Sequence, residues 1–231
     1  MRRGCRMLRI GHRGASGYKP ENTLLSFDKA LQLCVDMVEL DVRLCRTGEV
    51  VVIHDDTVDR TTNGTGRVAD MTLDELRRLN AGEGQKIPTL PEALNLVDRR
   101  AKVNIELKEE GSVWPVFELL EKYVKECGWS RDDFSISSFK RKHLQQFGKL
   151  SKEYRLGVLV QHPDKCLLEF AKKLDAYSIN VCFRSVSSKL IHDAHGKAIK
   201  VIVWTVDDKD DIQRMKSLQV DGIISNYPDR L

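Results

Sequence analysis

Two acidic residues stand at alternating positions inside an apolar run of the sequence. Glu39 and Asp41 are separated by a single leucine, and the positions around them are hydrophobic. Residues two apart on a β-strand point to the same face, so both carboxylates are expected to project together from one strand. Two acids on one buried face favour a bound cation, although an ion pair with Arg43 or an exposed edge strand would also fit the pattern.

A third acidic residue repeats this pattern farther along the chain. Asn104, Glu106 and Lys108 alternate with apolar residues and would share one face of a strand. Three close carboxylates would repel one another without a cation, and at least one would hold a proton. Because the donors are carboxylate oxygens, we expect Mg²⁺ or Ca²⁺, with Mn²⁺ as a further option, at a site where Glu39, Asp41 and Glu106 converge.

Two histidines follow short apolar runs near these acids. His12 and Arg13 come directly after the first such run, and His54 follows another at 50–53. Imidazole is suited to proton transfer near neutral pH, and two of them can act as base and acid in one displacement. The planar guanidinium of Arg13 fits a phosphate. Acids, cation, imidazoles and guanidinium together predict phosphoryl chemistry.

A repeating β/α pattern has to position these residues. Eight β-branched or apolar runs are predicted as central strands, with helical spacing between most of them. The predicted strands are 8–12, 37–42, 102–108, 134–139, 155–160, 176–181, 200–206 and 222–226. This repeat in 231 residues predicts an α/β chain in which residues 1–231 form a single (β/α)8 TIM-type barrel domain. An open doubly wound sheet is the alternative, and the strand count favours the barrel.

One strand-like segment does not fit the simple repeat. Residues 50–53 follow the second strand after only the short segment 46–49, which suits a hairpin and is too short for a helical crossover. We therefore expect an excursion above the second strand rather than a ninth barrel strand. Residues 57–88 then form a small insertion with one short helix near 72–80, and long insertions are often functional.

The bulk composition restricts the function classes. A balance of 38 basic and 34 acidic residues gives a net charge of only +4, which does not support nucleic-acid binding. The six cysteines are dispersed and predict reduced thiols. We expect no signal peptide and no transmembrane segment, because no window approaches the roughly 20 apolar residues that a bilayer requires. A cytoplasmic location is therefore expected, and the oligomeric state, including a homo-oligomer, stays open.

In their order along the chain, several short motifs resemble those of the glycerophosphodiester phosphodiesterase family. They are His12-Arg13-Gly14, Pro20-Glu21-Asn22-Thr23, Glu39-Leu40-Asp41-Val42, His54-Asp55, Glu106-Leu107-Lys108, Trp204-Thr205 and Asp221-Gly222-Ile223-Ile224. The resemblance runs from Gly11 to about Pro228. It implies a TIM-type barrel, a divalent cation and hydrolysis of a glycerophosphodiester, such as glycerophosphocholine or glycerophosphoethanolamine, to sn-glycerol 3-phosphate and an alcohol.

The resemblance also implies roles for individual residues. On matching positions, Glu39, Asp41 and Glu106 would be metal ligands. His12 and His54 would be the acid/base pair. Which histidine is the acid is left open, as is the choice between attack by water and attack by the substrate's own glycerol hydroxyl through a cyclic phosphate.

The remaining candidates would bind the substrate. The resemblance implies that Arg13 and Lys108 contact the phosphate and that Glu21 lies near the first histidine. Trp204, on the predicted strand 200–206, and Phe139, at the end of the predicted strand 134–139, could form apolar walls beside the glycerol carbons or could be plain core. We expect headgroup choice to depend on the insertion and the mouth loops. A lysophospholipase D acting on lipid-bearing substrates and a catalytically silent phosphate-binding barrel are the alternative functions.

Overall fold

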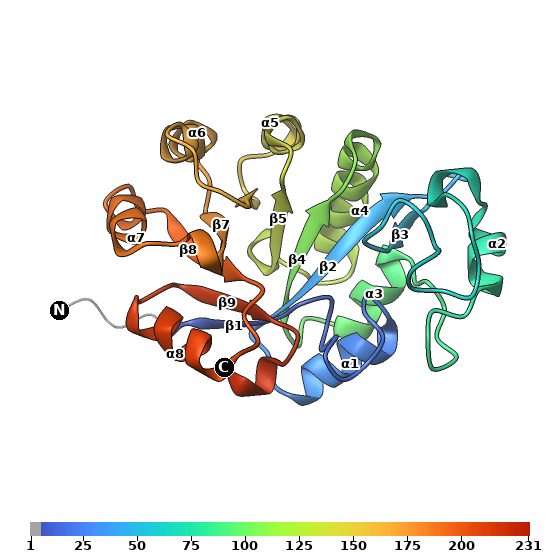
Figure 1. Ribbon diagram of the computed structural model, residues 1–231. Helices are drawn as coiled ribbons and strands as arrows, with labels where there is room; N and C mark the ends of the chain where they lie inside the picture. The colour runs from blue at the N-terminus through green and yellow to red at the C-terminus, as the bar shows by residue number, and fades with distance from the viewer. Residues whose placement is uncertain (1–5) are drawn as a thin grey trace.

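The central strands of the protein close into a ring. The computed structural model describes residues 6–231, and in it β1 pairs with both β2 and β9 (Figure 1). The ring strands, all parallel, are β1 (Leu8–Gly11), β2 (Met37–Leu44), β4 (Lys102–Leu107), β5 (Phe134–Ser138), β6 (Arg155–Val160), β7 (Ser178–Cys182), β8 (Lys200–Trp204) and β9 (Gly222–Ser225). This closure confirms the predicted TIM-type barrel and excludes the open sheet.

Helices connect consecutive ring strands and cover the outside of the barrel (Figure 1). They are α1 (Leu24–Gln32), α3 (Leu90–Val97), α4 (Val113–Glu126), α5 (Arg141–Leu150), α6 (Leu167–Leu174), α7 (Ser188–His195) and α8 (Lys209–Ser217). After β9 comes the 3₁₀ turn Pro228–Arg230. A capping box is formed by Thr89 and Glu92, and it satisfies two main-chain N–H groups at the start of α3.

The barrel has different packing on its two faces. Outward-facing strand residues pack with the helices in the main hydrophobic core. Inside the ring, a smaller apolar cluster is formed by Ile10, Met37, Ile202 and Ile224. Side chains alternate between the two faces of each strand, so Met37, Glu39 and Asp41 share the inner face of β2, and Glu106 lies on the inner face of β4. The barrel interior therefore holds an apolar cluster and a cluster of acids.

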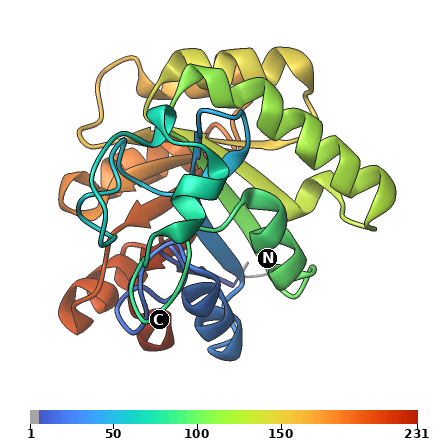
Figure 2. The same cartoon turned by 90° about the vertical axis from the view of Figure 1, so that its right-hand side faces the viewer.

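The insertion packs outside the ring beside β2. Strand β3 (Val50–Val52) pairs antiparallel with β2 and lies outside the ring, so the predicted excursion is confirmed. The following chain (teal in Figure 2) contains the short helix α2 (Leu73–Arg78) close to its predicted position. Apolar residues that include Leu76 and Ile87 form a separate small core there. The insertion thus has hydrophobic stabilisation of its own.

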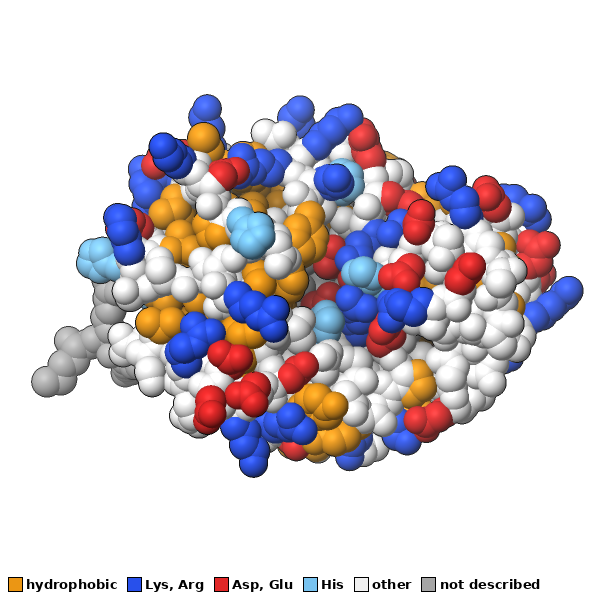
Figure 3. Space-filling model, viewed as in Figure 1, with side chains coloured by type: hydrophobic (Ala, Val, Ile, Leu, Met, Phe, Trp, Pro, Cys, Tyr) orange, Lys and Arg blue, Asp and Glu red, His pale blue; other side chains and the backbone are white. Residues whose placement is uncertain are grey.

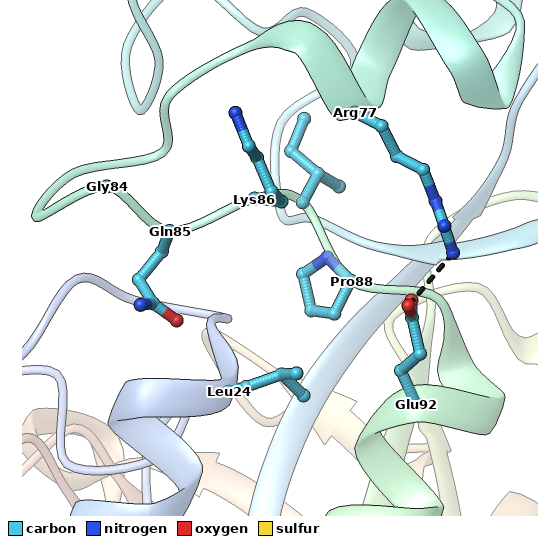
Figure 4. Close-up of a pocket in the computed structure, with 8 residues that line it drawn as sticks. Leu24, Arg77, Gly84, Gln85, Lys86, Pro88 and Glu92 are labelled. Atoms are coloured by element: carbon cyan, nitrogen blue, oxygen red, sulfur yellow. Dashed lines mark hydrogen bonds and ion pairs between the residues drawn. The ribbon is translucent and has the colours of Figure 1, made fainter.

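A groove marks the seam between the insertion and the helical layer (Figure 4). Leu24, Gln85 and Pro88 line a cavity of about 280 Å³, and Arg77 of α2 pairs with Glu92 of α3 at 2.9 Å across it. Its lining contains no residue of the predicted site. It lies where the insertion meets α1 and α3.

Two expectations from composition can be compared with the described part of the chain. No helix within residues 6–231 is long and apolar enough to cross a membrane. The cysteines in this part of the chain are free thiols, and Cys5 lies outside it. The free thiols are Cys34, Cys45, Cys127, Cys166 and Cys182.

Candidate active site

The three predicted ligand acids meet inside the barrel. Asp41 on β2 lies opposite Glu106 on β4, and Glu39 lies opposite Asn104. Carboxylate oxygens of Glu39, Asp41 and Glu106 lie within 4.8 Å of one another, and all three residues are buried. Arg43 is not their partner, because it pairs with an acid outside this cluster. An all-oxygen donor set of this kind fits Mg²⁺, Ca²⁺ or Mn²⁺.

Burial and mutual repulsion perturb the ionisation of these acids. Burial, and next the charge of Asp41, raises the pKa of Glu106 to about 7. Burial also raises the pKa of Glu39, with Asp41 and Glu106 adding to the effect. For Asp41 burial acts upward, but the charges of Lys108 and Arg13 outweigh it and hold its pKa well below the usual range. A divalent cation would stabilise the ionised form of all three.

Two basic residues lie in contact with the acid cluster. Lys108 Nζ is 3.0 Å from Asp41 Oδ1 and 2.6 Å from Glu106 Oε1. Arg13 Nε is 3.2 Å from Asp41 Oδ2, and the main-chain N–H of Arg13 donates to Glu39 Oε2 at 2.8 Å. Both predicted phosphate contacts are therefore at the site, and their binding of phosphate stays a prediction.

The tight turn after β1 places His12 and Arg13 over this cluster. Arg13 has a φ of 52° and Gly14 a φ of 85°, both in the left-handed region. A Cβ on Gly14 would lie 2.4 Å from Ser26 Oγ, so only glycine fits there. The His-Arg-Gly motif is thus explained by backbone geometry as well as by chemistry.

A chain of hydrogen bonds fixes the ring of His12. Its Nδ1 lies 2.7 Å from Asn226 Oδ1, and Asn226 Nδ2 donates to Asp207 Oδ2 at 2.6 Å. The carboxylate can only accept, so the Asn226 oxygen faces His12 and accepts the proton on Nδ1. Nε2 of neutral His12 is then the unprotonated nitrogen. Burial, and next the charge of Arg13, lowers the pKa of His12 to about 4.

His54 has a carboxylate partner instead of an amide. Its Nδ1 lies 2.6 Å from Asp55 Oδ1, and Arg60 Nε donates to Asp55 Oδ2 at 2.7 Å. The hydrogen bond from Arg60, together with that from His54, keeps the pKa of Asp55 below its usual range. Burial lowers the pKa of His54, while Asp41 and Asp55 oppose that shift. The two imidazoles therefore differ in their ability to hold a second proton.

Arg60 connects the insertion to both halves of the site. Besides Asp55, it donates to Glu21 Oε2 at 2.7 Å and to Glu21 Oε1 at 2.8 Å. Glu21 in turn pairs with Arg13 at 2.6 Å. Burial would raise the pKa of Glu21, but Arg60 and Arg13 lower it. Glu21 thus lies next to the first histidine motif, as expected, and contacts Arg13.

Aromatic side chains form the wall opposite the acids. Phe139 and Trp204 lie edge to face with ring centroids 5.4 Å apart. Trp204 Nε1 donates to the main-chain oxygen of Asn180 at 2.9 Å, which fixes the indole. Both rings line the same cavity as His12 and His54. Their placement fits the predicted apolar walls, and contact with glycerol carbons stays a prediction.

The site has an inner and an outer cavity. The inner one, about 100 Å³, lies between the acids, the histidines and the aromatic wall. The outer one, about 400 Å³, is lined by Arg43, Asp55, Asp56 and Lys140 and shares His54 with the inner one. Figure 3 shows the hollow near the centre of this face, with acidic side chains beside histidine and Lys or Arg side chains.

The sequence interpretation missed several polar residues of the site. Asp55 and Asn104 were visible in the motifs but received no role. Arg60, Asp207 and Asn226 gave no signal, because their partners are far away in sequence or depend on how a loop folds. A polar residue at an alternating strand position, as at Asn104, is the signal that could have been used.

Comparisons with known proteins agree with this geometry. The model of the glycerophosphoryl diester phosphodiesterase family matches residues 12–230. A glycerophosphodiester phosphodiesterase from Caldanaerobacter subterraneus is 39% identical over 96% of this chain and 95% of that protein. A putative glycerophosphodiester phosphodiesterase from Bacillus subtilis is 34% identical over 95% of this chain and 94% of that protein.

Solved structures share the fold over nearly the whole chain. An Oleispira antarctica phosphodiesterase in complex with the product sn-glycerol-3-phosphate has a TM-score of 0.90 and 29% identity, covering 97% of this chain and 95% of that one. A glycerophosphodiester phosphodiesterase from Thermotoga maritima has a TM-score of 0.84 and 29% identity, covering 97% and 96%. With the family match and the 39% identical relative, the chain belongs to the glycerophosphoryl diester phosphodiesterase family, a family of hydrolases.

Proposed function

We propose that this protein hydrolyses glycerophosphodiesters, such as glycerophosphocholine and glycerophosphoethanolamine, to sn-glycerol 3-phosphate and an alcohol. The observation that carries the proposal is one cavity in which a buried three-acid cluster lies beside two histidines with different partners. The product-bound structure of the Oleispira phosphodiesterase, at a TM-score of 0.90, supports the same product here.

The acid cluster fits a divalent cation, Mg²⁺, Ca²⁺ or Mn²⁺. Glu39, Asp41 and Glu106 would hold it, and when bound it would neutralise charge on the phosphoryl group. Arg13 and Lys108 both contact Asp41 of the acid cluster, and their two positive charges would also interact with the phosphoryl group.

The partners of the histidines support an assignment of roles. His12, neutral and with Nε2 unprotonated, would act as the base on the attacking hydroxyl. His54, whose carboxylate partner stabilises the imidazolium, would donate a proton to the leaving alkoxide. Asp55 would be a positioning residue for His54, and Arg60 would hold Asp55 in place.

The two cavities suggest where the halves of the substrate would bind. The glycerol half would fit the inner cavity against Phe139 and Trp204, and the alcohol half would fit the outer one. Charged side chains such as Arg43, Asp56 and Lys140 line the outer cavity, which argues against an acyl chain and so against the lysophospholipase D alternative. Its lining comes from the ends of β2, β4 and β5 and from the loops after β3 and β5, which supports the mouth loops as determinants of headgroup choice. No residue of 57–88 lines it, so a role of the insertion in that choice stays a prediction.

The direct test is release of glycerol 3-phosphate from glycerophosphocholine and glycerophosphoethanolamine in Mg²⁺, Ca²⁺ or Mn²⁺. We expect turnover that a chelator abolishes and that His54→Ala reduces by about a hundredfold or more, while His162→Ala, at an exposed histidine, leaves it unchanged. Full activity in chelator or in His54→Ala would overturn the mechanism. Tight binding without turnover in every metal would favour the catalytically silent barrel.

The same reaction can distinguish the two routes of attack. A transient cyclic glycerophosphate in the ³¹P NMR spectrum would identify attack by the glycerol hydroxyl, and its absence from trapped early time points would favour water. The single-domain organisation, a cytoplasmic location and homo-oligomerisation stay predictions.

A further inference from the structure

Asn104 lies on β4, two residues before the ligand acid Glu106, and faces the interior of the barrel. It lines the inner cavity and is only 4% exposed. Its Nδ2 donates to Ser137 Oγ at 3.1 Å. Its Oδ1, however, has no hydrogen-bond partner among residues 6–231. The amide of Asn104 is thus held through its nitrogen, while its oxygen has no partner and the residue lines the inner cavity.

A buried carbonyl oxygen without a donor is rare in folded proteins and calls for an explanation. The neighbours of Asn104 in this cavity cannot readily supply one. With a cation bound, Glu39 and Glu106 would be ionised and could only accept hydrogen bonds, and Phe139 offers no polar group. The basic side chains of the same lining already contact carboxylates: Lys108 contacts Asp41 and Glu106, and Arg13 contacts Glu21 and Asp41. The missing donor therefore has to come from a bound molecule.

The chemistry of the cavity indicates which molecule. Its aromatic wall suits the carbon chain of a small polyol, and its opposite side holds the acids and the basic residues that would engage the phosphate. The glycerol half of a glycerophosphodiester carries two free hydroxyls, and each can donate one hydrogen bond.

We infer that Asn104 is a specificity-determining residue whose Oδ1 accepts a hydrogen bond from a free hydroxyl of the substrate's glycerol half. The inference rests on the proposed function. Ser137 acts as a positioning residue, because its bond to Nδ2 turns the amide oxygen toward the cavity. Diesters whose retained half lacks that hydroxyl are poor substrates, since they leave the amide oxygen unpaired.

The test uses three substrates and two variants. The substrates are glycerophosphocholine and the corresponding phosphocholine esters of 1,3-propanediol and 1,2-propanediol, each of which lacks one of the two hydroxyls. In the wild type, we expect kcat/KM to fall by about tenfold to a hundredfold for one of the two analogues. Asn104→Ala should lower kcat/KM for glycerophosphocholine by a similar factor and leave that analogue unchanged within about threefold.

Controls separate this role from others. Mn²⁺ affinity of Asn104→Ala, measured by calorimetry, should stay within about twofold of the wild type, and Ser137→Ala should show a smaller loss that still depends on the hydroxyl. An equal loss for all three substrates, no loss at all, or a large drop in Mn²⁺ affinity would overturn the inference. Failure of the wild type to release glycerol 3-phosphate would instead overturn the proposed function, and the inference with it.

Discussion

Metal binding should be strongly pH-dependent between pH 6 and pH 8, because one of the proposed ligands, Glu106, titrates there. Burial, and next the charge of Asp41, places the pKa of Glu106 at about 7 in the metal-free protein. A cation binds the ionised carboxylate, so a proton must leave before or during binding. The affinity for the cation should therefore rise as the pH rises.

The magnitude follows from the fraction of Glu106 that is ionised. With a pKa of about 7, that fraction is about nine-tenths at pH 8 and about one-tenth at pH 6, so the apparent Kd should increase by about tenfold as the pH falls from 8 to 6. The raised pKa of Glu39 would make the change steeper. Asp41, whose pKa is lowered, stays ionised throughout this range and adds nothing.

Isothermal titration calorimetry with Mn²⁺ would measure this effect. Titrations at pH 6, 7 and 8 in two buffers with different heats of ionisation give both the affinity and the number of protons released. We expect release of about half a proton or more at pH 7. Glu106→Gln should bind more weakly and with a shallower pH dependence, and Glu121→Gln, a change outside the site, should leave the dependence intact. An affinity that is constant from pH 6 to pH 8, without proton release, would refute the reasoning.

Three further predictions concern the partners of the histidines and the insertion. The double change Asp207→Asn with Asn226→Asp gives His12 Nδ1 a carboxylate partner while keeping an amide donor opposite it, and should raise the pKa of His12 from about 4, so in saturating metal the acid limb of the kcat/KM profile moves to higher pH; an unmoved limb would contradict the base assignment. Asp55→Asn removes the carboxylate partner of His54 and should lower kcat by about tenfold or more, with KM little changed. Leu76→Ala, at a fully buried position, should destabilise the insertion by about 2–4 kcal/mol; hydrogen exchange should then accelerate there and not in the barrel strands.

The strands could be predicted from the sequence because local pattern and tertiary environment agree. The run predicted as 155–160 is β6 (Arg155–Val160), and the other ring strands differ from their predictions by at most two residues at either end. Ring strands are covered by helices on one face and buried inside the barrel on the other, so they appear as nearly continuous apolar runs. A polar residue in such a run is conspicuous, which is why Glu39, Asp41 and Glu106 could be identified.

The hydrogen-bond partners of the site could not be predicted in the same way. Arg60 lies in an irregular part of the insertion, and its position over Glu21 and Asp55 depends on how that segment folds on its own small core. Loop conformation is set by such packing rather than by a sequence period. The sequence therefore indicated that two imidazoles were present but not how strongly each one holds a proton.

The two histidines obtain their hydrogen-bond partners in different ways, and only the partner of His12 depends on closure of the ring. His12 and Asn226 are 214 residues apart in the sequence, and only the pairing of β1 with β9 brings them within 2.7 Å. His54 receives its partner from the adjacent residue, Asp55, and needs no closure. A partly folded chain in which β9 is detached would thus keep the His54 pair and lose the bond that fixes the tautomer of His12. The proposed base is therefore assembled only with the complete barrel, whereas the proposed acid is built from local sequence.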